Sequence, residues 1–160
     1  MNETVMINAY IVISIIIAAT DMLLAVKSFK KNKTTGRFLG FACMGAAIVD
    51  ISYLISIISD SYMCMAIMSS IYFISIDFML VSLLIFTVYF TKGKFSGYGK
   101  WMVAFCFLYC IYELIVFAVN PFMEIAIEYK PRDTLIAKYS YHMKPLYDLH
   151  LIFSYVMVLL

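Results

Sequence analysis

Residues 63–90, MCMAIMSSIYFISIDFMLVSLLIFTVYF, form an unbroken apolar stretch whose only charged residue is Asp77. A helix needs about 20 mostly apolar residues, at roughly 1.5 Å rise per residue, to cross about 30 Å of hydrocarbon. At the same rise this stretch would be roughly 42 Å long, enough to tilt in a bilayer or to extend beyond it. The stretch therefore predicts an integral membrane protein.

The rest of the chain repeats this pattern on both sides. The sequence of 160 residues is 64% hydrophobic and 14% charged, whereas soluble domains are roughly 45 to 50% apolar and about 25% charged. We expect an all-α membrane bundle with four complete spans and the start of a fifth; their predicted ranges are 5–26, 38–58, 63–90, 101–119 and 149–160. Because the last range is too short to cross, we expect a piece of a longer chain or an incomplete reading frame, with more helices and another domain to follow.

The basic residues predict the orientation, because cytoplasmic loops are enriched in Lys and Arg. The connection after the first span and the one after the third are basic, through Lys27, Lys30, Lys31, Lys33, Arg37, Lys92, Lys94 and Lys100. The N-terminal tail with Glu3 and the short connection with Asp60 carry no base. We therefore expect a multi-pass protein of the cytoplasmic membrane, with the N-terminus and residues 120–148 outside.

Residues 120–148 change from helical to strand periodicity. Apolar residues alternate with polar or small ones from Ile125 to Tyr129 and again over 135–141, and Pro131 lies between the two runs. Alternation with period two predicts strands, and proline suits the second position of a turn. We expect a β-hairpin across the outer helix ends, with Glu124, Glu128 and Lys138 on its solvated face; an irregular loop is the alternative.

Each complete span contains one acid, and these are Asp21, Asp50, Asp77 and Glu113. An ionised acid at the bilayer centre costs about 2.5 to 3.5 kcal/mol, so such acids face the protein interior and suggest function. The alternative is that each acid is protonated or hydrogen-bonded and only holds helices together. We expect a polar cavity that opens outward under the hairpin and binds an unknown small ligand; the candidate residues are Asp50, Tyr53, Asp77, Glu113 and His150.

Catalytic and metal-binding motifs are missing from the sequence. Cys106 and Cys110 share a helix face, but no histidine or second thiol pair at a suitable spacing completes a tetrahedral set. We expect core thiols, no metal, no cofactor and no catalytic residue.

A net charge of +2 gives no basic face for nucleic acid. The second predicted span contains small residues that allow another helix to approach closely, namely Gly40, Ala42, Gly45 and Ala46.

The end of the fourth span and the start of the fifth resemble a known family, the N-terminal seven-transmembrane region of histidine kinases. The resemblance rests on Ala118-Val119-Asn120-Pro121, on Leu149-His150 and on Phe153-Ser154-Tyr155. The chain departs from that pattern where the family often has histidines after Asn-Pro and a tryptophan before Leu-His; here Met123-Glu124 and Tyr147-Asp148 stand in those places.

This resemblance implies a sensory input module of seven helices, followed on the cytoplasmic side by a histidine kinase or a diguanylate cyclase, and acting as a homodimer in the lipid bilayer. It implies no enzymatic activity within these residues. Two other classes stay open. One is a small transporter or channel subunit that uses the intramembrane acids, and the other is a non-catalytic structural membrane subunit.

Overall fold

The computed structural model describes residues 3–31, 33–94, 97–134 and 136–159. Four long helices, two short strands and one shorter helix follow one another: α1 (Glu3–Lys30), α2 (Thr34–Ile58), α3 (Tyr62–Lys92), α4 (Gly97–Met123), β1 (Ile127–Pro131), β2 (Tyr139–Met143) and α5 (Pro145–Leu159). The four long helices are each long and apolar enough to cross a membrane. The predicted all-α membrane bundle with a small hairpin is thereby confirmed in its architecture.

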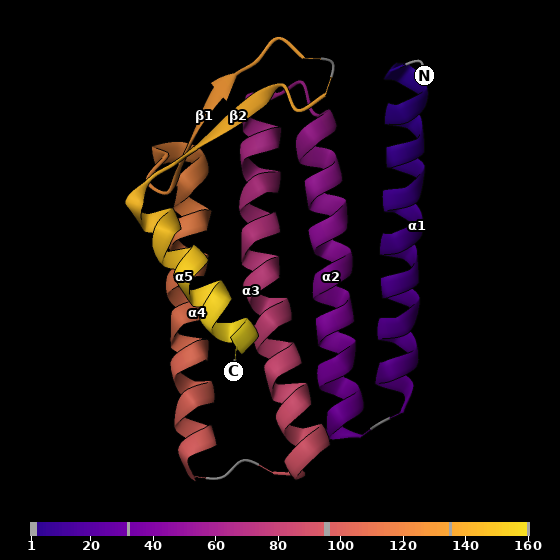
Figure 1. The fold of residues 1–160 in the computed structure, drawn as a ribbon, viewed down its shortest axis with the longest axis vertical. Helices are drawn as coiled ribbons and strands as arrows, with labels where there is room; N and C mark the ends of the chain where they lie inside the picture. The colour runs from indigo at the N-terminus through magenta and orange to yellow at the C-terminus, as the bar shows by residue number, and fades with distance from the viewer. Residues whose placement is uncertain (1–2, 32, 95–96, 135, 160) are drawn as a thin grey trace.

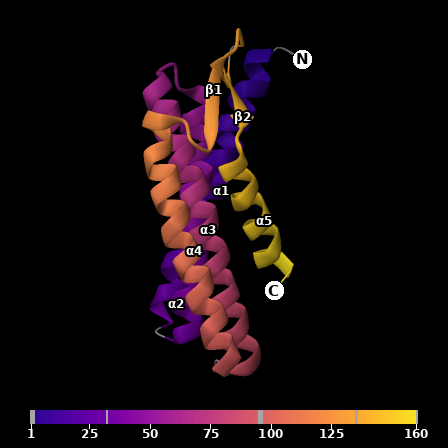
Figure 2. The same ribbon diagram turned by 90° about the vertical axis from the view of Figure 1, so that its left-hand side faces the viewer.

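The four long helices stand side by side in chain order, and each packs against the next (Figure 1). The hairpin crosses one end of this row, and the N-terminus lies at the same end. The basic connections that follow α1 and α3 lie at the opposite end (Figure 1). Helix α5 runs back from the hairpin on one side of the row, against α3 and α4 (Figure 2). The hairpin and α5 therefore cover the upper half of the α3–α4 pair.

Each helix is longer than its predicted span. α4 continues through Pro121 to Met123, and α5 begins at Pro145, before the predicted start at residue 149; Leu160 lies outside the described residues. Hydropathy identifies only the part of a helix that is apolar enough for lipid. The helix itself continues until a cap or a chain reversal ends it. For α5 the difference matters, because it places His150 within the helix and away from its first residue.

Glycines bring α2 close to its neighbours, as their small size predicted. A Cβ atom on Gly45 would lie 3.0 Å from the Cβ of Met79 and 3.2 Å from its Cα, on α3. A Cβ atom on Gly40 would lie 2.8 Å from the ring of Phe29 on α1. Without a hydrophobic driving force between helices in lipid, such close packing is a main source of helix association.

The hairpin exists, but its second strand begins later than predicted. β1 and β2 are antiparallel, with Ile127 opposite Met143 and Pro131 opposite Tyr139. The predicted run over 135–138 is not a strand among its described residues, and Leu135 lies outside them. The reason is a competing hydrogen bond, because the Ala137 N–H donates to the Ile57 carbonyl of α2 at 2.7 Å.

The predicted solvated face of the hairpin is confirmed for Glu128 and Lys138, whose side chains are 36% and 40% exposed, but not for Glu124, which precedes β1. Lys138 forms an ion pair with Asp60, in the connection between α2 and α3, and the Tyr62 hydroxyl donates a hydrogen bond to Glu124. Glu128 lies 3.5 Å from Lys130 of its own strand. The contacts of Lys138 and Glu124 therefore attach the hairpin region to the α2–α3 connection and to the start of α3.

Candidate functional site

The buried amide of Asn120 joins the last turn of α4 to the hairpin. Its Oδ1 accepts the N–H groups of Ala126 and Ile127 at 2.8 and 2.9 Å, and its Nδ2 donates to the Ile127 carbonyl and the Tyr129 hydroxyl, both at 3.2 Å. Burial raises the pKa of Tyr129 above its ordinary value, so the phenol stays neutral. The chain reverses at Glu124, whose φ of 48° is left-handed. The Asn120 side chain thus joins the end of α4 to the start of β1, and Tyr62 and Lys144 hold the chain reversal at Glu124 as well.

A cavity of about 260 Å³ lies beneath the hairpin, which we call the hairpin cavity. It is lined by Tyr53, Ser56, Ser69, Tyr72, Phe73, Ile127, Tyr141, Met143 and Tyr147. The hydroxyls of Ser69 and Tyr141 meet across it at 3.1 Å. We predicted a polar cavity at this place, but lined by acids. Its polar groups are instead hydroxyls, and the acids lie elsewhere.

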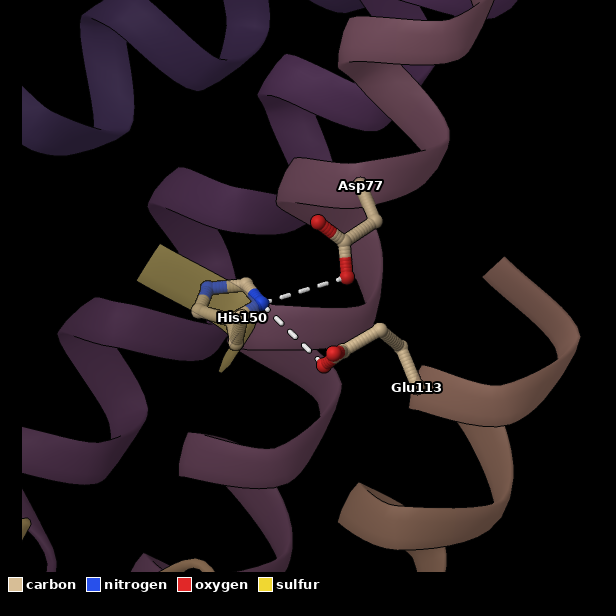
Figure 3. Close-up of side chains that lie close together, drawn as sticks. All are labelled: Asp77, Glu113 and His150. Atoms are coloured by element: carbon tan, nitrogen blue, oxygen red, sulfur yellow. Dashed lines mark hydrogen bonds and ion pairs between the residues drawn. The ribbon is translucent and has the colours of Figure 1, made fainter. Parts of the chain in front are cut away.

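Three buried side chains from three helices meet beside this cavity, and we call them the buried triad. Asp77 comes from α3, Glu113 from α4 and His150 from α5 (Figure 3). The His150 Nδ1 lies 3.2 Å from Glu113 Oε2, to which it is hydrogen-bonded, and 3.4 Å from Asp77 Oδ2. The three residues are 1%, 1% and 3% exposed, in chain order. The buried triad therefore links α3, α4 and α5 in their interior.

Aromatic rings hold the imidazole of His150 in place. The rings of Phe73 and Phe117 stand nearly perpendicular to it, with centroids 5.4 and 5.1 Å away, and the Tyr147 ring centroid is 5.6 Å away. Edge-to-face contacts at this separation fix the plane of a ring. Since Phe73 and Tyr147 also line the hairpin cavity, the cavity and the buried triad share part of their walls.

Most of the carboxylate oxygens in the buried triad have no hydrogen-bond donor among the described residues. Both side-chain oxygens of Asp77 and the Oε1 of Glu113 are buried without a hydrogen bond, although Asp77 Oδ2 is within ion-pair distance of His150. The hydroxyls of Tyr109 and Ser154, on α4 and α5, are buried and unpaired as well. A buried polar group without a partner is costly and calls for an explanation. Here the unpaired atoms gather around one histidine.

The structure brings together three of the five predicted site residues and separates the other two. Asp77, Glu113 and His150 form the buried triad. Asp50 is partly buried on α2 and lies at a mostly apolar pocket between α1 and α2, whereas Tyr53 lines the hairpin cavity. α5 begins about one turn before the predicted start of the fifth span, and His150 lies buried within it.

No described thiol belongs to the group of ligand atoms in the buried triad, and the described thiols are all free. Cys106 is 1% exposed and its Sγ lies 3.3 Å from the Met157 Sδ, between α4 and α5. Sequence reasoning missed the structural role of Asn120 and the part of Tyr72 and Tyr141 in the cavity. The Asn-Pro pair at the end of a span was the one available indication, since a buried amide there can satisfy a chain reversal.

Comparison with known families supports the resemblance seen in the sequence. The family model described as the N-terminal 7TM region of histidine kinase matches residues 9–160. Comparison with curated proteins and with solved structures finds no match. The family is a membrane sensory input region and not a catalytic domain, and the match covers nearly the whole chain. The chain, a multi-pass membrane protein, therefore belongs to the family of N-terminal 7TM regions of histidine kinases.

Proposed function

We propose that this chain detects an extracytoplasmic or in-membrane signal and passes it to a cytoplasmic output domain, a histidine kinase or a diguanylate cyclase. One observation carries this proposal. The hairpin cavity and the buried triad share Phe73 and Tyr147, so a ligand in the cavity presses on the residues that join α3, α4 and α5.

The mechanism is a shift between two packings of these helices. A volume of about 260 Å³ is just below the roughly 300 Å³ at which drug-sized ligand sites begin, so the cavity suits a small molecule. Such a ligand shifts the equilibrium only as far as it binds one packing better than the other. Movement of α5 against α3 and α4 then reaches the output domain, within a homodimer formed by the full-length protein.

The proposed orientation places the hairpin and the N-terminus outside and the basic connections in the cytoplasm. It can be tested with Lys130→Cys on β1 and Lys30→Cys on α1, both exposed positions. In intact spheroplasts a membrane-impermeant maleimide should label Lys130→Cys, while Lys30→Cys should react only after permeabilisation. The unsubstituted chain gives the background from its own four cysteines. The opposite labelling pattern contradicts this orientation.

Filling the hairpin cavity tests the sensory function without knowledge of the ligand. Ser69 is 2% exposed and lies on the cavity wall, so Ser69→Phe places a ring where a ligand would bind. We expect the basal output of the full-length gene product in membrane vesicles to change by about tenfold, which corresponds to roughly 1.4 kcal/mol between the two packings. The readout is autophosphorylation from ATP, or cyclic-di-GMP synthesis from GTP.

The matched control is Leu83→Phe, which adds a ring on the same helix at a position that is 43% exposed and lines no described cavity. This control should leave the output unchanged. Both variants must elute as the unsubstituted protein does in size exclusion and keep its helical circular dichroism. If folded Ser69→Phe has the same output as Leu83→Phe, the cavity does not control the output and the proposal fails.

A further inference from the structure

One ligating atom from each residue of the buried triad lies within 4.8 Å of the others. The three side chains point toward one another from three different helices (Figure 3). We propose that Asp77, Glu113 and His150 bind a divalent transition-metal cation of the zinc type. The binding of the metal does not depend on the proposed sensory function, whereas its effect on output rests on that function.

The separations within the buried triad suit a shared ion. Ligands about 2.0 to 2.1 Å from a zinc ion lie roughly 3.3 to 3.4 Å apart across a tetrahedral angle. The His150 Nδ1 lies 3.2 Å from Glu113 Oε2 and 3.4 Å from Asp77 Oδ2. Both distances from His150 therefore already match a shared ion, and the two carboxylate oxygens lie within 4.8 Å of each other.

The charge of the buried triad also suits a divalent cation. Two carboxylates face a single imidazole N–H, and three of the four carboxylate oxygens have no hydrogen-bond partner among the described residues. In an apolar interior, uncompensated negative charge is strongly unfavourable. A divalent cation with a neutral imidazole balances both carboxylates, and it gives the unpaired oxygens of Asp77 a partner.

The chemistry of the ligand set selects the class of metal. One imidazole nitrogen and two carboxylates are ligands that zinc accepts at its catalytic sites. Calcium and magnesium prefer oxygen ligands alone, and copper(I) prefers sulfur. The buried triad contains a nitrogen and no sulfur, so it favours zinc and its divalent neighbours over all three.

Three protein ligands leave one coordination position open. Tyr109 is four residues before Glu113 on α4, and Ser154 is four residues after His150 on α5, each about 6 Å along the axis. Both hydroxyls are buried and unpaired. Residues four apart share a helix face, so either hydroxyl can take the open position directly or hydrogen-bond a water or small ligand that occupies it.

Cobalt(II) and zinc(II) are the probes that test this site. The full-length gene product, purified in detergent and stripped with a chelator, is titrated with Co²⁺ in the absence of nucleotide. We expect one Co²⁺ per chain at this site with visible d–d absorption, displaced by Zn²⁺ but not by Mg²⁺ or Ca²⁺. X-ray absorption at the zinc edge should show nitrogen and oxygen ligands at about 2.0 to 2.2 Å and no sulfur.

Charge-neutral variants locate the ion. Asp77→Asn and Glu113→Gln keep the shape of each side chain, and each should weaken Co²⁺ binding by at least roughly 100-fold, since even residues outside the ligand shell change affinity by 10 to 100-fold. The matched controls are Asp148→Asn, an exposed acid on α5, and His142→Asn, an exposed histidine on β2. Both controls should bind Co²⁺ as the unsubstituted chain does.

Several results overturn the proposal. They are the absence of Co²⁺ and Zn²⁺ binding, binding that survives in Asp77→Asn and Glu113→Gln, and a zinc spectrum with sulfur ligands. The absence of metal binding means that protons alone balance the negative charge of the buried triad. If the variants fail to fold, the zinc spectrum of the unsubstituted protein still decides, because it needs no substitution.

The regulatory effect has its own measurement. In membrane vesicles, addition and chelation of Zn²⁺ should change the output of the full-length gene product severalfold, and should leave the output of Glu113→Gln unchanged. If the metal binds but the output does not change, regulation by the metal is contradicted, whereas the metal site itself is confirmed. The Ser69→Phe experiment decides the sensory function independently, because it uses no metal.

Discussion

Replacing His150 with leucine should destabilise the protein by about 3 to 5 kcal/mol, measured with chelator present. The substitution removes the single N–H that faces both carboxylates and leaves Asp77 and Glu113, each 1% exposed, opposite each other. Removing one partner of a buried charge set costs this much because the remaining charge is uncompensated. The measurement is unfolding by SDS in mixed micelles, followed by circular dichroism.

The triple variant Asp77→Val, Glu113→Leu and His150→Leu tests the cause. Buried ionic groups replaced together by apolar ones of similar volume are often neutral or even stabilising, so the triple variant should be more stable than His150→Leu alone. His142→Leu, at an exposed position on β2, should change stability by less than about 0.5 kcal/mol. If the stability loss of the triple variant equals the sum of the losses of the three single variants, an electrostatic cause is contradicted.

The second large effect is expected at Asn120. Asn120→Ala leaves the N–H groups of Ala126 and Ile127 without their acceptor, and both residues are 0% exposed. Each unsatisfied buried group costs about 1 to 3 kcal/mol, so we expect a loss of roughly 3 kcal/mol. Because the bonds are local to the chain reversal, hydrogen exchange should accelerate by more than about tenfold in β1 and little in α2.

Asn120→Asp separates the two halves of this contact. The aspartate keeps the oxygen that accepts both N–H groups and loses the amide that donates to the Ile127 carbonyl and the Tyr129 hydroxyl. The stability of Asn120→Asp should lie between that of the unsubstituted chain and that of Asn120→Ala. Equal exchange rates in β1 for Asn120→Ala and the unsubstituted chain would show that other contacts hold the hairpin.

The hairpin shows where local patterns stop being informative. Period-two alternation correctly predicted two strands after α4, because alternation is a property of neighbouring residues. It placed the second strand too early, because the Ala137 N–H bonds to the Ile57 carbonyl and not to β1. Alternation also could not show that Lys138 pairs with Asp60, since Asp60 is far from Lys138 in sequence and close to it in space.

The sequence by itself determined that this is a membrane bundle, that a hairpin follows α4, and that Asp77, Glu113 and His150 are the residues to examine. Hydropathy, periodicity and the cost of an acid in lipid are local properties that a sequence displays directly. Only the tertiary structure decided that these three residues meet, that Asp50 does not join them, and that hydroxyls line the hairpin cavity. Those facts depend on how α3, α4 and α5 pack, and no spacing along one chain encodes a contact between side chains of three separate helices.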